Sequence, residues 1–283
     1  MKPYIELTKP RITWLILMST AIGYFYGLDG SWNLAILFHT LLGTGLLASG
    51  TAALNQWMER AADARMHRTR QRPLPSGTLT PNRALAWGVL LSITGFAELA
   101  LAVNPLTALL GLFTLLSYLL LYTPLKQRSP HSTTVGAIPG AMPPLIGYAA
   151  AAGSLGIEAW VLYAILFVWQ FPHFYSIAWM YREDYARAGI RMKPVVEPDG
   201  VSTARHILYT SILLIPVSLL PVWFDMTGRL YILGACAAGL YVLYSGIRVS
   251  LDRSLVRARG VLLASVVYLP LLFGFMLLDR PGL

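Results

Sequence analysis

Long apolar runs alternate with short polar segments along almost the whole chain. A run of roughly 17–25 apolar residues is long enough to cross a bilayer as an α-helix. We therefore expect an all-α integral membrane protein with about nine transmembrane helices, in which residues 1–283 form a single membrane-embedded domain. A transmembrane β-barrel would show short alternating segments instead. The expected spans are residues 12–28, 34–54, 83–103, 105–122, 133–152, 158–178, 207–224, 229–248 and 260–278.

The composition supports a lipid environment. Hydrophobic residues make up 56% of the chain and charged residues only 12%, whereas a soluble domain carries about 25% charged residues. Prolines interrupt two of the spans, at Pro143-Pro144 and at Pro216. We expect kinks or partly unwound segments at these positions, because proline lacks the N–H that a helix interior needs.

The positive charges fall mainly on one side of the expected bundle. Of the 22 lysines and arginines, 20 lie in the N-terminal segment or in the loops that follow even-numbered spans. By the positive-inside rule this side is cytoplasmic, and it includes the N-terminus. The net charge of +9 is then explained by topology, so the expected partner is the lipid bilayer and not nucleic acid. We expect the active-site loops on this side, at about 55–82, 123–131 and 180–205.

The most informative polar residues are Asn55, Glu59 and Asp63, where the second apolar run ends. Steps of four residues on an α-helix return to nearly the same face, turning by about 40° and rising about 6 Å each. The three side chains therefore form one oxygen-rich column. Hard cations such as Mg²⁺ take oxygen ligands and usually share them with substrate phosphates. The column predicts a Mg²⁺–diphosphate site at the membrane surface.

A basic segment follows this column directly. Arg68 and Arg72 come soon after Asp63 in the sequence, and arginine binds phosphate oxygens bidentately. Polar groups at the membrane end of a helix are costly and tend to be functional, which favours a binding site. The alternative is that Glu59 and Asp63 only pair with neighbouring arginines on a solvated helix end.

Two further polar clusters lie on the same side. Lys126 and Arg128 follow the fourth span and could hold phosphate oxygens, while Tyr122 could lie against a cationic intermediate. Asp184 follows the sixth span and could ligate a second Mg²⁺. Taken alone, each cluster could also be an interfacial anchor. Together with the column, they predict an isoprenoid diphosphate as substrate, whose ionisation leaves an allylic cation and a diphosphate that metal and basic groups neutralise.

At these residues the chain resembles the UbiA-type intramembrane prenyltransferases, and within them the subfamily that farnesylates haem. The likeness runs from residue 7 to about 194. Two departures stand out: Ala188 lies where the wider family's second motif carries another Asp, and Lys193 lies where the subfamily carries an apolar residue. The matching segments are Leu7-Thr8-Lys9-Pro10-Arg11, Asn55-x3-Glu59-x3-Asp63, Met66, Arg68-Thr69, Arg72-Pro73-Leu74, Tyr122-Thr123-x2-Lys126, Gly140-Ala141-x-Pro143-Pro144-Leu145-Ile146-Gly147, Trp169-Gln170-x-Pro172-His173-Phe174 and Tyr181-x2-Asp184-Tyr185-x2-Ala188-Gly189-x2-Met192-x-Pro194.

The resemblance implies a central intramembrane cavity and a farnesyl transfer. Farnesyl diphosphate, haem B and water would give haem O and diphosphate, for the biogenesis of haem–copper terminal oxidases in the cell inner membrane. Haem B is then a substrate and not a resident cofactor, and haem A synthase or oxidase assembly proteins are candidate recipients of the product. The implied roles are Mg²⁺ binding by Asn55, Glu59, Asp63 and Asp184, diphosphate binding by Arg68, Arg72, Lys126 and Arg128, and a catalytic part for Tyr122.

Other assignments have alternatives. His173 is the best candidate for a haem-iron ligand, because it follows Pro172 near the cytoplasmic end of an aromatic span; hydrogen-bonded packing is its alternative role. Glu98 lies inside the third span, where we expect a hydrogen bond to a neighbouring helix. Two other functions are a prenyltransferase for another acceptor, such as a quinone-precursor phenol, and a small-molecule transporter. A transporter would need ionisable residues along a path through the membrane, whereas here they crowd one face.

Overall fold

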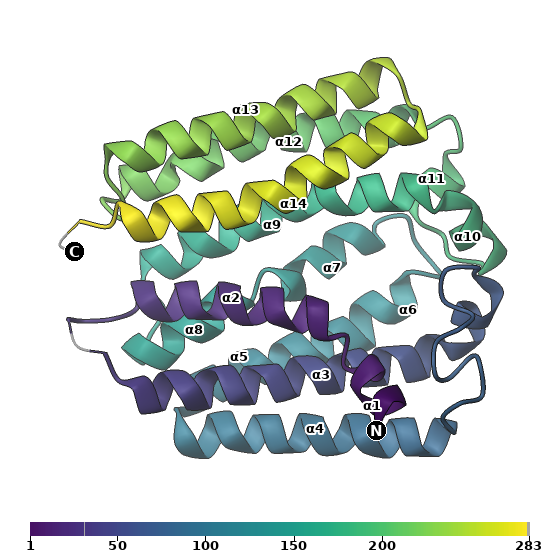
Figure 1. Ribbon diagram of the computed structural model, residues 1–283, viewed down its shortest axis with the longest axis horizontal. Helices are drawn as coiled ribbons and strands as arrows, with labels where there is room; N and C mark the ends of the chain where they lie inside the picture. Colours follow the sequence, from purple (N-terminus) through teal and green to yellow (C-terminus); the bar gives the residue numbers. More distant parts are fainter. Residues whose placement is uncertain (31, 282–283) are drawn as a thin grey trace.

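The protein is described by a computed structural model that covers residues 1–30 and 32–281. Throughout the described chain the regular structure is helical, and most of the long helices lie side by side in a bundle (Figure 1). The helices are α1 (Lys2–Leu7), α2 (Pro10–Tyr26), α3 (Leu34–Arg65), α4 (Pro81–Ala102), α5 (Pro105–Leu116), the π-helix η1 (Ser117–Tyr122), α6 (Thr123–Leu125), α7 (Ser132–Gly140), α8 (Pro143–Ala152), α9 (Ile157–Met180), α10 (Arg182–Arg187), α11 (Lys193–Val196), α12 (Val201–Trp223), α13 (Arg229–Leu251) and α14 (Leu255–Leu278).

Eight helical segments within the described residues are long and apolar enough to cross a membrane. They coincide with the second to ninth predicted spans, which confirms an all-α membrane protein. At the first predicted span lies α2, which has 17 residues and is not among the eight. The count of nine and the cytoplasmic N-terminus therefore stay predictions. The largest differences in bounds are that α3 continues to Arg65 and that α12 already begins at Val201, so both helices extend into segments expected as loops.

The two proline positions behave differently. The helix breaks between α7 and α8, at Ala141 and Met142, directly before Pro143-Pro144, as expected. At Pro216 no segment is unwound, because α12 runs without interruption from Val201 to Trp223, and a kink there stays a prediction. Transmembrane helices tolerate proline where neighbouring helices and local adjustments satisfy the freed backbone groups.

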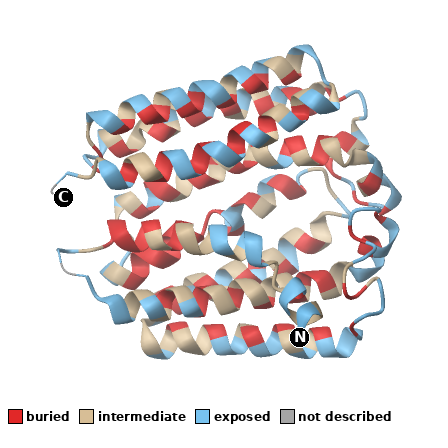
Figure 2. Ribbon diagram, in the orientation of Figure 1, coloured by how far each residue is buried: buried red, intermediate tan, exposed pale blue. Residues whose placement is uncertain are grey.

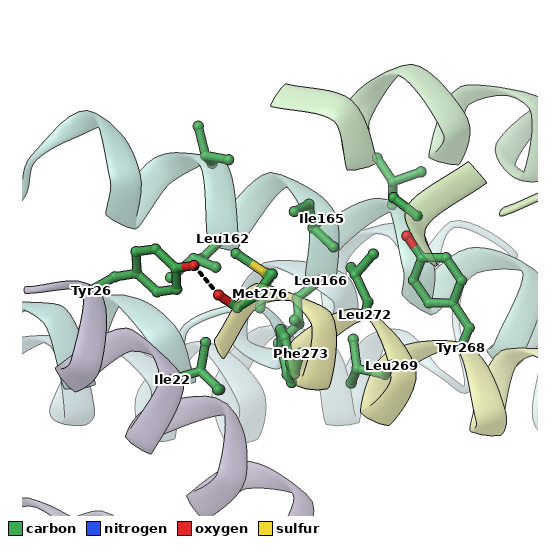
Figure 3. Packing of buried hydrophobic residues seen from close by; sticks show 14 of the residues in the cluster. Ile22, Tyr26, Leu162, Ile165, Leu166, Tyr268, Leu269, Leu272, Phe273 and Met276 are labelled. Carbon is green, nitrogen blue, oxygen red and sulfur yellow. Dashed lines mark hydrogen bonds between the residues drawn. The ribbon is translucent and has the colours of Figure 1, made fainter. Parts of the chain in front are cut away.

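The main core joins α2 and α9 to α14. Figure 3 shows Leu162, Ile165 and Leu166 of α9 packed against α14, whose Leu272 is fully buried. The hydroxyl of Tyr26 on α2 donates to the backbone oxygen of Met276 at 2.9 Å. The most completely buried segment is α8, every residue of which from Pro143 to Ala150 is buried (Figure 2). This core packs α9 against α2, α8 and α14.

A second close contact joins α3 to α4, which lie side by side in Figure 1. A Cβ added at Gly50 would lie 2.8 Å from the backbone oxygen of Gly88, so only glycine permits this approach. Near the opposite end of the same pair, Glu98 meets His39, with 2.6 Å between Oε1 and Nδ1. Glu98 therefore makes the expected hydrogen bond to a neighbouring helix.

A cavity of about 510 Å³ lies between these two parts of the bundle. Most of its lining comes from α2, α3, α5, η1, α7 and α9, and single residues or pairs come from α4, α8 and α14; most of the side chains that line it are apolar. Lys9, Tyr122 and His173 are among the few polar lining residues that also belong to the sequence motifs. The central intramembrane cavity is thus present, and it reaches the motif residues.

Candidate active site

The predicted column lies on the last turns of α3. Asn55 and Asp63 are each 1% exposed, and the side chain of Glu59 is 12% exposed. The helix reaches this far because the hydroxyl of Thr69 donates to the backbone oxygen of Asp63 at 2.8 Å, which satisfies a carbonyl near the helix end. Three oxygen-bearing side chains are thereby held on one buried helix face.

Each carboxylate of the column forms an ion pair with a cationic side chain that the sequence analysis predicted to bind the diphosphate. Nη1 of Arg72 donates to both oxygens of Asp63, at 3.0 and 2.8 Å. Nζ of Lys126 lies 2.9 Å from Oε1 of Glu59. Burial by itself would lower the pKa of Lys126, but the Glu59 carboxylate together with Tyr122 and Tyr118 raises the pKa above its usual value. Lys126 is therefore held as a cation at the site.

Asp184 is bound to the loop that follows α3. Its two carboxylate oxygens accept from the backbone N–H groups of His67 and Arg68, at 3.1 and 3.3 Å, and it also pairs with Arg187. Burial would raise the pKa of Asp184, but these hydrogen bonds together hold it below its usual value. Asp184 thus joins the second loop to the first, while its role as a metal ligand stays a prediction.

Ala188 and Lys193, the two residues that depart from the family pattern, each have defined contacts. Ala188 is 4% exposed and packs in a small apolar cluster with Ala62 and Met66, so this position joins the loops by apolar contact. Nζ of Lys193 lies 3.5 Å from Nε2 of His206.

The remaining predicted cations lie further out. Arg68 is exposed, and its guanidinium lies 5.1 Å from the ring centre of Tyr181. Arg128 is exposed as well and has no ion pair with any described residue. The structure therefore brings Arg72 and Lys126 to the column and leaves Arg68 and Arg128 near the surface.

Tyr122 lies at the end of η1, and Tyr122 and Tyr118 both line the cavity. The N–H of Thr123 donates to the carbonyl of Tyr118, five residues back, which is the pattern of a π-helix. The two rings meet edge to face with centres 4.9 Å apart, and Nζ of Lys126 lies 4.5 Å from the centre of the Tyr122 ring. The π-helix thus stacks an aromatic face beside the cationic end of the cavity.

His173 faces the cavity from α9, on the side away from the column's helix. Its Nδ1 lies 2.9 Å from the hydroxyl of Ser265, and its ring stacks on Trp169 with centres 4.8 Å apart. Trp169 in turn donates to the backbone oxygen of Ser265 at 2.7 Å. These contacts fix a flat aromatic wall, and iron ligation by His173 stays a prediction.

Lys9 belongs to the site, although the sequence analysis assigned it no role beyond a motif match. It adopts a left-handed conformation, with φ of 49°, and its Nζ donates to Oδ1 of Asn55 at 3.4 Å. Burial lowers the pKa of Lys9 to about 8, with a further contribution from Arg72 and Lys126. Unlike Arg72 and Lys126, Lys9 has no carboxylate partner among the described residues. The signal that could have revealed it is a lysine directly before the proline that begins the first span.

The oxygen donors of the column suit a hard divalent cation. Within residues 1–30 and 32–281, no three His, Cys, Asp or Glu side chains converge into a ready-made metal cage. Mg²⁺ usually keeps several waters and is bound through one or two carboxylates together with substrate phosphates. The donor set of Asn55, Glu59 and Asp63 therefore fits a Mg²⁺ ion that is shared with a diphosphate.

Several known proteins match this chain over nearly all of its length. The sequence profile of the UbiA prenyltransferase family matches residues 16–276. The protoheme IX farnesyltransferase of Solibacter usitatus is 68% identical, and the match covers 100% of both chains. Among solved structures, digeranylgeranylglyceryl phosphate synthase superimposes with a TM-score of 0.82 at 16% identity, over 100% of this chain and 99% of that one. A UbiA homologue from Archaeoglobus fulgidus, bound to GPP and Mg²⁺, superimposes with a TM-score of 0.64 at 15% identity, over 97% and 99% of the two chains.

Proposed function

Because the chain belongs to the UbiA prenyltransferase family, we propose that it transfers a farnesyl group from farnesyl diphosphate to a vinyl group of haem B. Water is added in the same reaction, and the products are haem O and diphosphate. The observation that carries the proposal is the meeting of Asp63 with Arg72, and of Glu59 with Lys126, next to Lys9 and Tyr122, which line an apolar cavity. One end of this site suits a charged head group and the rest suits an isoprenoid tail.

The first step is ionisation of the bond between C1 of the farnesyl group and the diphosphate oxygen. Both electrons of that bond leave with the diphosphate. Lys126, Arg72 and Lys9 supply positive charge where the negative charge grows, in a buried site where such charges act strongly. A Mg²⁺ ion held by Asn55, Glu59 and Asp63 would neutralise further charge on the leaving diphosphate.

The allylic cation must then be kept from water until the acceptor captures it. The cavity is lined mainly by apolar side chains, and Tyr122 presents an aromatic face beside Lys126, on which a cation is stabilised. The vinyl group supplies an electron pair to C1 and forms the new C–C bond. The positive charge then lies on the vinyl carbon beside the haem ring, where water adds and loses a proton to leave a hydroxyl group.

We place the acceptor on the α9 side of the cavity. Trp169 and His173 form a flat wall there, which suits a planar macrocycle. We infer that the reaction takes place near the cytoplasmic face of the cell inner membrane, because the site lies among the basic loops. Haem O would remain in the bilayer, so haem A synthase or an oxidase assembly protein is the expected recipient.

The choice of acceptor tests this proposal. Purified protein in lipid nanodiscs, supplied with farnesyl diphosphate and Mg²⁺, is expected to convert haem B into haem O and to leave 4-hydroxybenzoate unchanged. The two acceptors are offered together, and the products are identified by chromatography and mass spectrometry. Farnesylated 4-hydroxybenzoate without haem O would assign the protein to a quinone-precursor pathway instead.

A further inference from the structure

The two sides of the central cavity are built differently. Toward α2 and α9 the lining includes side chains that also face outward: Ile12 is 55% exposed, Leu15 45% and Phe174 36%. Toward α3, α4 and α5 the lining is closed, since Leu47 is 4% exposed, Leu99 0% and Leu115 8%. A broad, flat acceptor needs the side toward α2 and α9, because that side is open. The closed side toward α3, α4 and α5 suits a narrow apolar chain.

Leu99 of α4 closes the inner end of the side that is lined by α3, α4 and α5. Its side chain lies between two glycines on neighbouring helices: a Cβ added at Gly43 of α3 would lie 2.7 Å from Cγ of Leu99, and one added at Gly111 of α5 would lie 3.2 Å from its Cδ1. The same added Cβ at Gly111 would lie 2.9 Å from Cδ1 of Leu47. Leu99 therefore sits tightly between α3 and α5 and, like Gly111, lines the cavity.

The closed side of the cavity, between α3, α4 and α5, forms an arm. The depth of this arm matches the length of one prenyl chain. Asn55, at the head-group end, and Thr44, at the level of Leu99, are eleven residues apart on α3, which corresponds to about 16 Å along the helix. An extended chain gains about 1.2 Å per main-chain bond, so the eleven bonds of a farnesyl chain span about 13 Å and the fifteen of a geranylgeranyl chain about 18 Å. The arm accommodates the first chain and is too short for the second.

We propose that the arm between α3, α4 and α5 holds the prenyl tail and that Leu99 is the floor that sets the longest tail accepted. This inference rests on the proposed function, because it assumes a prenyl diphosphate with its head at Asn55, Glu59 and Lys126. Gly111 has a complementary part, because it lines the arm and a side chain added there would crowd Leu47 and Leu99 and take up space at the inner end of the arm. The two positions should therefore change chain-length preference in opposite directions.

The test is a competition between donors of different length. Haem B is offered to the purified protein with geranyl, farnesyl and geranylgeranyl diphosphate together, and the ratio of the products gives the ratio of kcat/KM values. Leu99→Ala is expected to raise use of geranylgeranyl relative to farnesyl diphosphate at least about tenfold, and Gly111→Val to raise use of geranyl relative to farnesyl diphosphate by a similar factor. Leu101→Ala is the matched control, because Leu101 lies on the same helix and is 88% exposed.

The product ratio is measured within one sample, so it does not depend on how much of a variant is correctly folded. Product ratios within twofold of wild type in both Leu99→Ala and Gly111→Val would overturn the proposal. A wild-type protein that forms no prenylated haem from any donor would instead contradict the proposed function itself. The two failures are therefore distinguishable.

Discussion

Replacing Asp63 with asparagine is expected to lower kcat/KM for haem O formation by at least about 10³-fold. Asp63 is 1% exposed and is one of two carboxylates on the column. Asparagine keeps the size of the side chain and one acceptor oxygen but removes the negative charge that a divalent cation needs. The rate of haem O formation with saturating farnesyl diphosphate and Mg²⁺ measures the effect.

The same substitution also leaves Arg72 without a charged partner, so folding must be checked separately. Breaking a buried ion pair costs about 3–5 kcal/mol, and the thermal midpoint and elution profile of the variant show whether it remains folded. Asp252→Asn is the matched control: Asp252 is an exposed carboxylate paired with Arg257 at 3.2 Å, away from the cavity. A folded Asp63→Asn protein with wild-type activity would remove Asp63 from the catalytic machinery.

Replacing Lys126 with methionine is expected to lower kcat/KM by about 10²–10³-fold, and the corresponding change at Lys9 by about 10–100-fold. Methionine keeps an apolar side chain of similar length and removes the ammonium group. Lys126 is bound to Glu59 at 2.9 Å and borders Tyr122, so it can act on the diphosphate and on the cation beside it. Lys9 also lines the cavity, but its Nζ contacts the column only through Oδ1 of Asn55, at 3.4 Å, and it has no carboxylate partner among the described residues.

Conservative replacements separate charge from packing in this series. Lys126→Arg and Lys9→Arg are expected to recover most of the lost activity, because they restore the positive charge. Lys2→Met is the control, since Lys2 is exposed at the start of α1. Steady-state kinetics with varied farnesyl diphosphate measures all five variants, and full activity of Lys126→Met would show that Lys126 does not act on the leaving group.

Local periodicity predicted the column. The four-residue spacing of Asn55, Glu59 and Asp63 needs only a helix, and α3 provides one through Arg65. The eight confirmed spans follow from apolar length in the same way. These features depend on residues close together in the sequence, which is why the sequence carries them.

Non-local contacts could not be derived in this way. The left-handed backbone of Lys9 and its contact with Asn55 depend on α1 packing against α3, where Nε2 of Gln56 donates to the backbone oxygen of Leu7 at 2.9 Å. The attachment of Asp184 to the N–H groups after α3 likewise joins segments more than 100 residues apart. Pro216 does not unwind α12, because proline is tolerated inside a membrane helix whose neighbours compensate for it.

The most direct test of the whole account is a structure of the protein with Mn²⁺ in place of Mg²⁺ and with farnesyl thiodiphosphate, in which anomalous scattering locates the metal. We predict that the metal is bonded to oxygens of the Asn55, Glu59 and Asp63 column and to the diphosphate. We also predict that Lys126 contacts that diphosphate and that the tail points toward Leu99. A metal or a diphosphate bound away from this column would contradict the account.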